Sequence, residues 1–125
     1  MAKRRSDGFL LPYNEWELET SRRDAADEGE ILFPTGGAGC LYPPGSLDPV
    51  VTNEDLFLKL APNADDVWFF WCARMAMSKH INTPQTFHMT EWPSSQDVAL
   101  KHDNFFSNGN DTQIRALEEY FGPVP

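Results

Sequence analysis

The strongest hydrophobic pattern in the chain runs from residue 65 to about residue 79. At helical spacing its apolar residues leave no polar face, which is typical of a helix buried on nearly all sides. Two aspartates, Asp65 and Asp66, stand at its start, and aspartate is favoured where a helix begins. The pattern therefore predicts a buried helix that opens on two carboxylates.

Two further helices are predicted from residues that mark helix ends. The first lies between Thr52, which can cap it, and Pro62, which cannot continue it. The second lies between a cap at Asn110 or Asp111 and a stop at Gly122, and its apolar residues fall on one face. Both are expected to pack one side against a core.

Short strands are predicted where apolar residues alternate or cluster. Phe9, Leu11 and Tyr13 alternate, and the proline among them favours an edge strand. Residues 31–33 and 84–89 also have strand-like composition. The fold class expected from these elements is α+β, a small two-layer or three-layer assembly of short strands with about three helices.

Length and charge narrow the class of protein. The 125 residues are enough for one domain with a modest core, and we expect residues 1–125 to form it, with residues 1–8 flexible. The formal net charge of −9 repels nucleic acid and anionic lipid, whereas an acidic cleft suits a divalent cation or an uncharged substrate. No apolar run has the length of a transmembrane segment or follows the basic N-terminus as in a signal peptide, so the expected location is the cytoplasm.

Residues 35–49 are dense in glycine and proline. Gly36, Gly37 and Gly39 allow unusual backbone angles and let the backbone pass close to another group. A phosphate-binding glycine loop opens a helix, but here a strand-like stretch and two prolines follow, so neither a Rossmann nor a Walker motif is indicated. A tight turn and a close approach to a ligand both remain open.

The aspartate pair has two interpretations. Capping explains both carboxylates, because negative charge is favourable at the positive end of a helix. Alternatively, a carboxylate held in a fixed direction can take a proton from a hydroxyl or bind a metal through oxygen. The spacing of Asp65 and Asp66 alone does not separate these two roles.

Four segments in order resemble the C-terminal half of bacterial glycosyltransferases of the GT-A type. These segments read LPYNEWE, ILFPTGGAGCLYPPGSL, LFLKLAPNADDVWFFWCARMA and LKHDNFFSNGNDTQIRAL. The most similar members are family 2-like enzymes of lipopolysaccharide and capsular polysaccharide biosynthesis. The resemblance covers roughly residues 9–122, and its most specific part is LYPPGSL followed by LAPNADDVWF.

The resemblance implies a role for each motif. Gly36, Gly37 and Gly39 match a glycine-rich loop that lies beside the donor and acceptor sugars. Asp65 and Asp66 match an acidic motif at a helix start whose carboxylate serves as the base in inverting enzymes, and Asp66 is the first choice. Such a base takes the proton of the attacking hydroxyl and favours an oxocarbenium-like transition state.

Other candidate site residues follow from the same resemblance. Many GT-A domains use a late histidine to hold the metal, and His88 matches that place best, although a histidine there is more often a surface or core residue. Aromatic side chains that stack on sugars are common in this class. Trp16, Tyr42 and Trp92 are the candidates for that role.

One departure from the family pattern limits what the chain is expected to do. A complete GT-A enzyme has a nucleotide-binding half with an Asp-x-Asp motif that helps to hold Mn²⁺ or Mg²⁺, and this sequence contains no such triplet. The chain therefore resembles the acceptor-side half, active only with a donor-binding partner. A truncated gene, a split enzyme and a repurposed remnant are the open origins, and the alternative function is a non-catalytic acidic interaction module.

Overall fold

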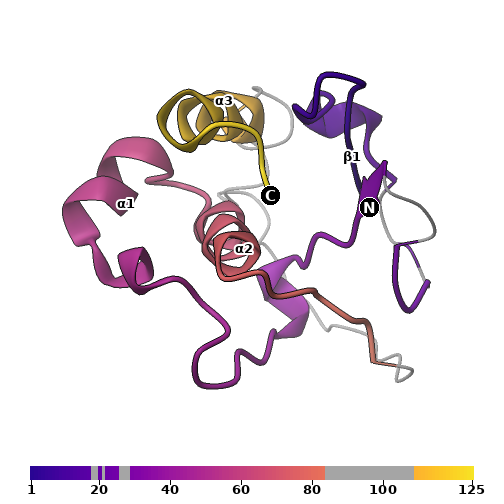
Figure 1. Cartoon of the computed structure of the whole chain (residues 1–125), viewed down its shortest axis with the longest axis horizontal. Coiled ribbons are helices and arrows are strands. Elements are labelled where there is room, and N and C mark those ends of the chain that lie inside the picture. Colours follow the sequence, from indigo (N-terminus) through magenta and orange to yellow (C-terminus); the bar gives the residue numbers. More distant parts are fainter. Residues whose placement is uncertain (18–19, 21, 26–28, 84–108) are drawn as a thin grey trace, which may run out of the picture.

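The computed structural model describes residues 1–17, 20, 22–25, 29–83 and 109–125. It is a small α+β fold in which three α-helices lie beside a two-stranded antiparallel sheet (Figure 1). The helices and strands are β1 (Ala2–Lys3), β2 (Glu30–Ile31), α1 (Glu54–Leu60), α2 (Asp65–Met75) and α3 (Gly109–Phe121). The general class predicted from the sequence, with about three helices, is confirmed for the described residues.

Helix α2 is the centre of the core, as predicted. Trp68, Phe70 and Trp71 are fully or almost fully buried, because the helix has apolar side chains on nearly every side. The helix ends at Met75, and the prediction that it reaches residue 79 is wrong. Met77 has a φ of 58° and its N–H donates to the Arg74 carbonyl oxygen, so a left-handed residue closes the last turn.

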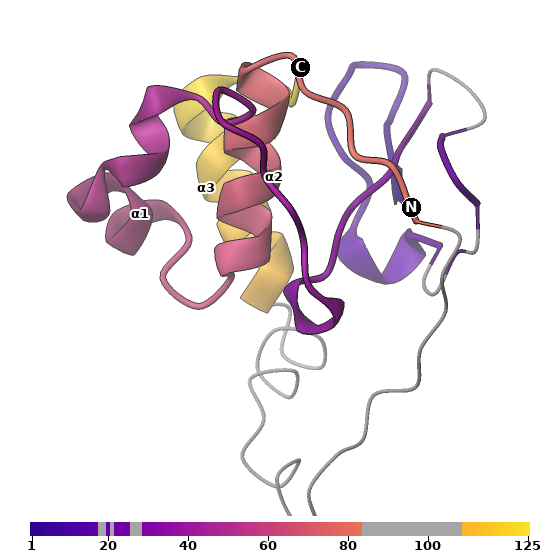
Figure 2. The ribbon, with the colours of Figure 1, turned by 90° about the horizontal axis from the view of Figure 1, so that it is seen from below.

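Helix α3 lies alongside α2, and α1 packs on the outer side of α3 (Figure 2). The predicted cap of the first helix is wrong: the side chain of Asn53, not Thr52, accepts the Leu56 N–H at 3.0 Å. Thr52 belongs to a preceding 3₁₀ turn, Pro49–Thr52, and its hydroxyl donates to the Pro49 carbonyl. The start of α1 is therefore shifted by this turn.

The predicted caps of α3 serve other segments. The helix begins at Gly109, so Asn110 and Asp111 lie inside its first turn. Asp111 Oδ1 accepts the Tyr13 N–H at 2.8 Å and thereby joins α3 to the N-terminal segment. The predicted stop is confirmed, because α3 ends at Phe121 and Gly122 follows with a φ of 85°.

The N-terminal segment differs most from the sequence-based expectation. The alternation across residues 9–13 does not form a strand; only Leu10 makes an isolated bridge, to Arg4. Tyr13–Glu15 form a 3₁₀ turn instead, and the residues buried here are Leu10 and Tyr13 rather than the alternating set Phe9, Leu11 and Tyr13. The strand predicted at residues 31–33 is found as Glu30–Ile31, whereas that at 84–89 lies outside the described residues.

Residues 1–8, for which flexibility was expected, carry β1. Ala2 is buried and pairs with Ile31 of β2, and Met1 is also buried. The N–H of Arg4 donates to the Gly29 carbonyl at 2.8 Å and extends this pairing. This part of the chain therefore contributes to the core rather than standing away from it.

Candidate functional site

The aspartate pair occupies the first turn of α2. Asp65 Oδ1 accepts the Asp66 N–H at 3.0 Å, and Asp66 Oδ1 accepts the Val67 N–H at 2.8 Å. The residue at the cap position, Ala64, has no side-chain oxygen, so the two carboxylates provide the acceptors for this helix end. Capping by the pair is therefore present in the structure.

The two aspartates differ in their surroundings. Asp65 is exposed, whereas Asp66 is half-buried. Burial raises the pKa of the Asp66 carboxyl above its ordinary value; Asp65 adds to the rise, and the Val67 N–H opposes it. A carboxylate with a raised pKa is a better proton acceptor than an ordinary one, which makes Asp66 the more suitable base of the pair.

Two phenols lie within the electrostatic reach of Asp66. Burial raises the pKa of Tyr13 most, and the charge of Asp66 raises it further. For Tyr42, burial is again the main cause of the raised pKa, followed by the Cys40 thiol and then by the charge of Asp66. The charge of Asp66 thus acts on two tyrosines from segments far apart in sequence.

The glycine-rich turn lies beside this end of α2 (Figure 2). Gly36–Ala38 form a 3₁₀ turn in which Gly37 is exposed, and Gly39 follows with a φ of 88°, a conformation that glycine adopts without strain. No atom lies within 4 Å of the position that a Cβ would take at Gly36 or Gly39. The backbone of the turn is therefore open on that side.

Tyr42 fixes the turn against α2. Its ring stacks on Phe69 with the centroids 5.5 Å apart and meets the edge of His80 at 6.0 Å. Phe70 lies on another side of the His80 ring, at 5.9 Å. Tyr42 is therefore held in an aromatic cluster, and its ring faces are already in contact with protein groups.

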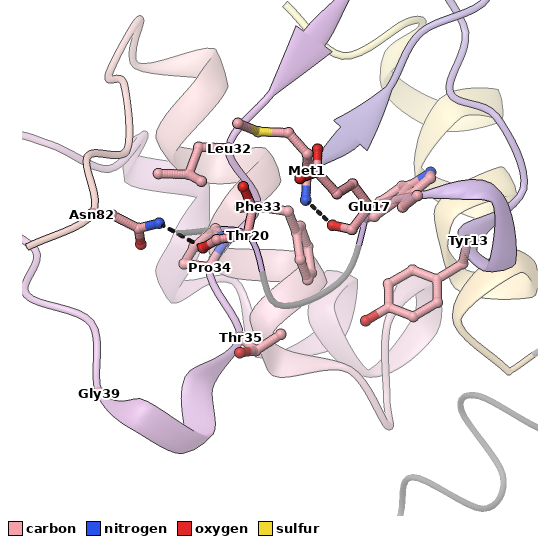
Figure 3. Close-up of a pocket in the computed structure, with 11 residues that line it drawn as sticks. Met1, Tyr13, Glu17, Thr20, Leu32, Phe33, Pro34, Thr35, Gly39 and Asn82 are labelled. Atoms are coloured by element: carbon pink, nitrogen blue, oxygen red, sulfur yellow. Dashed lines mark hydrogen bonds between the residues drawn. The ribbon is translucent and has the colours of Figure 1, made fainter. Parts of the chain in front are cut away.

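A pocket of about 190 Å³ opens next to the glycine turn (Figure 3). It has aromatic, hydroxyl and amide groups in its wall. The residues that line it are Met1, Tyr13, Trp16, Glu17, Thr20, Leu32, Phe33, Pro34, Thr35, Gly39 and Asn82. Of the residues predicted for the site, Trp16 and Gly39 line this pocket, whereas Asp65 and Asp66 do not.

Trp16 is less accessible than its polar sequence neighbours suggested. Only 6% of the residue is exposed, and its indole N–H donates to the Leu11 carbonyl at 2.8 Å. Its ring packs against Tyr13 and Phe33, with centroid distances of 4.8 and 5.1 Å. Trp16 thus supports the pocket wall as part of the core.

The predicted metal site finds no support in the described part of the chain. There, no three His, Cys, Asp or Glu side chains gather as ligands for an ion. The described residues therefore do not fit the Mn²⁺ or Mg²⁺ expected from the resemblance. His88 and Trp92, predicted for metal and sugar binding, lie outside the described residues.

Three residues of this region were not selected from the sequence. Tyr13 was assigned to a strand, Asn110 to a cap, and His80 to no role. Asn110 hydrogen-bonds the Tyr13 hydroxyl with its side chain, while its Oδ1 is buried without a partner. Both ring nitrogens of His80 are also buried without partners. In the sequence, these three residues are distinguished only by their position next to a strongly apolar or helix-forming segment.

Comparisons with family models, curated proteins and solved structures find no match. Within the described residues, every helix is too short or too polar for a bilayer crossing.

Proposed function

We propose that this chain is the acceptor-side half of a glycosyltransferase in the cytoplasm that moves a sugar from a nucleotide-sugar donor to a glycan or lipid-linked acceptor. The resemblance in sequence suggests this class, and one structural observation supports it most. The half-buried carboxylate of Asp66, fixed by the Val67 N–H, lies beside the glycine turn and within reach of two tyrosines. An aspartate that only caps a helix can remain exposed to solvent, as Asp55 does at the start of α1.

The proposed chemistry is a single displacement at the anomeric carbon of the donor. The acceptor hydroxyl oxygen forms a bond to that carbon, and the bond from the carbon to the nucleotide diphosphate breaks. The diphosphate leaves with the bonding electrons, and the hydroxyl proton passes to Asp66. Because burial raises the pKa of Asp66, its affinity for the proton increases, which is what a general base requires.

Donor binding is assigned to a partner chain or to a segment outside the described residues. The sequence has no Asp-x-Asp triplet, and the described residues offer no cluster for a divalent cation. Among the predicted substrate-binding residues, Gly39 lines the pocket, and Gly36 and Gly37 belong to the turn that precedes it. Tyr42 holds this turn on α2.

The test is reconstitution of transfer. The chain is combined with the polypeptide encoded immediately upstream, and transfer from nucleotide sugars to saccharide acceptors is measured. Asp66→Asn is expected to lower transfer by about 10²–10⁴-fold, because it removes the base while keeping the acceptor of the Val67 N–H. Asp55→Asn is the matched control, since Asp55 is an exposed first-turn aspartate of α1. Equal activity of both variants would exclude Asp66 as the base.

A second candidate is a non-catalytic acidic interaction module. It is favoured by the hydrogen bonds of Asp65 and Asp66 to N–H groups of their own helix, which are those expected of capping alone. This candidate predicts no transfer with any donor-binding partner. It also predicts that replacing either aspartate changes stability and nothing else.

A further inference from the structure

The pocket beside the glycine turn has the size and lining of a site for a small polar ligand with an apolar face. Its 190 Å³ corresponds to about six water molecules, well below the volume of a drug-sized site. Rings of Tyr13, Trp16 and Phe33 form one part of the wall. Hydroxyl and amide groups of Thr35 and Asn82 form another (Figure 3).

The charged groups next to this pocket are already paired. Arg22 binds the Glu17 carboxylate at 2.5 Å and the Glu30 carboxylate at 2.7 Å, so its charge is used inside the protein. The Met1 amino group donates to the Glu17 carbonyl oxygen. A neutral ligand would leave all of these contacts intact.

Polar groups remain for a neutral ligand. The Asn82 amide nitrogen donates to the carbonyls of Thr20 and Arg22, at 3.3 and 2.8 Å, and no described residue donates to its Oδ1. Thr35 precedes the glycine turn, and its hydroxyl makes no capping bond there. An amide oxygen and a hydroxyl beside aromatic rings are the groups that recognise sugars, which have polar edges and an apolar face.

Tyr13 is held firmly in the wall of the pocket. Its backbone is held by Asp111 and its ring by Trp16 and Phe33, so α3 and the segment after β2 both fix its position. Its ring lines the pocket and its hydroxyl lies in the field of Asp66. Asn110, which hydrogen-bonds Tyr13, is 5% exposed, and its Oδ1 is buried with no donor. Buried polar atoms are usually hydrogen-bonded, so this oxygen can accept a hydrogen bond from a ligand.

We propose that this pocket binds one uncharged hexose ring of the acceptor, and that Tyr13, which lines the pocket, is a positioning group that orients this ring for transfer. The second part rests on the function proposed above, while the first part does not. The pocket wall then selects a neutral sugar, and the orientation of the sugar against Tyr13 selects which hydroxyl reacts. Tyr13 acts through the substrate's position, not as the proton acceptor.

Binding is tested on the chain alone. A panel of neutral methyl hexosides is titrated into isotopically labelled protein, and the amide signals of Tyr13, Thr35, Gly39 and Asn82 are followed by NMR. At least one hexoside is expected to shift these signals saturably. Inorganic phosphate and a methyl hexuronide are the charged probes, and they are expected to bind at least about tenfold more weakly. Absence of saturable shifts with every hexoside, or tighter binding of the charged probes, would overturn the pocket assignment.

Two variants remove single hydroxyl groups from the wall. Tyr13→Phe and Thr35→Val are each expected to weaken hexoside binding by about fivefold, the effect of one hydrogen bond. Tyr120→Phe is the matched control, because Tyr120 is exposed on α3 and does not line the pocket. Wild-type affinity in both wall variants would contradict the assignment. A heteronuclear spectrum of each variant shows whether it remains folded.

The reconstituted enzyme separates this inference from the proposed function. There, Tyr13→Phe is expected to raise the acceptor KM about fivefold and to change the site on the acceptor that is modified, without moving the pH profile set by Asp66. Hexoside binding without any transfer would reject the transferase function and keep the pocket. Transfer without hexoside shifts, or with an unchanged KM in Tyr13→Phe, would reject the pocket and keep the function.

Discussion

Helices α1 and α2 both begin with two acidic residues, yet the two helix ends have different environments. In α1 the pair is Glu54 and Asp55, both exposed, and the capping bond comes from the preceding Asn53. In α2 the pair is Asp65 and Asp66, and these carboxylates themselves accept the N–H groups of the first turn. The same local pattern therefore supports a helix end in two ways.

The difference comes from residues distant in sequence. Asp66 is half-buried, and its charge raises the pKa of Tyr13 in the N-terminal segment and of Tyr42 in the loop after the glycine turn. Asp55 is exposed to solvent. Acidic residues at a helix start thus become candidates for chemistry only where tertiary packing removes them from water, because burial changes the pKa.

The largest expected effect tests the contrast between the bodies of the two helices. Phe70→Ala in α2 should lower the free energy of unfolding by about 3–5 kcal/mol, because the ring is fully buried and packs on Phe33 at 5.1 Å. Leu58→Ala in α1 should change it by no more than about 0.5 kcal/mol, since Leu58 is exposed. Urea unfolding followed by circular dichroism measures both. If Phe70→Ala does not fold, Phe70→Leu gives a smaller loss; similar effects in the two helices would refute a core centred on α2.

A second prediction concerns the cap of α1. Asn53→Ala should cost about 1 kcal/mol, because it removes the acceptor of the Leu56 N–H. Asn53→Asp keeps an acceptor and should retain stability. Thr52→Ala, at the position first expected to be the cap, should have the smaller effect of the two alanine variants in the same urea assay. A larger loss in Thr52→Ala would place the cap one residue earlier.

The third prediction compares how Asp66 of α2 and Asp55 of α1 affect the free energy of unfolding. The pKa of Asp66 is raised in the folded state, so the unfolded chain loses its proton more readily, and stability is lost as the pH rises through the folded pKa. At pH 7 Asp66→Asn should therefore increase the free energy of unfolding. Asp55→Asn should decrease it by about 0.3–1 kcal/mol, because it only removes a favourable charge from a helix N-terminus. A decrease in both variants would mean that Asp66 is an ordinary cap.

The smallest expected effect is a pH dependence of the free energy of unfolding caused by His80, which follows the C-terminal end of α2. Burial lowers the pKa of His80 below 6.5, and the charge of Arg74 lowers it further, while Tyr42 and Phe70 contact its ring. The unfolded chain then binds the proton first, so stability is lost as the pH falls below about 6.5. Replacing His80 by leucine should make the free energy of unfolding less dependent on pH between 7 and 5. An unchanged slope would show that His80 does not titrate in this way.

The sequence was most informative where structure depends on local pattern. The apolar spacing within α2 predicts its burial, and Gly122 predicts the end of α3, because both signals act within one or two helical turns. The end of α2 was missed because its left-handed closing residue is Met77, a residue type that seldom takes this conformation. The predicted cap of α1 was one residue too early, because the 3₁₀ turn Pro49–Thr52 includes Thr52 and leaves Asn53 as the cap.

The N-terminal segment and the pocket could not be derived from pattern alone. The alternation at residues 9–13 has a strand-like period, but Tyr13 begins a 3₁₀ turn and packs its ring against Phe33. The pocket combines Tyr13, Gly39 and Asn82, whose proximity is set by the whole fold. Asp66 could be selected from the sequence as an acidic helix start, whereas its half-buried state depends on these distant contacts.

The link between Tyr13 and Asp111 has a consequence for how the protein is made. The two residues are 98 positions apart, and the Leu10 N–H likewise depends on Glu118 of α3. At about 5–20 residues per second, a ribosome needs roughly 5–20 s to deliver α3 after the N-terminal segment has emerged. During that interval Met1, Ala2 and Leu10 have no completed core to enter, and chaperones that shield nascent chains have their longest opportunity to bind there.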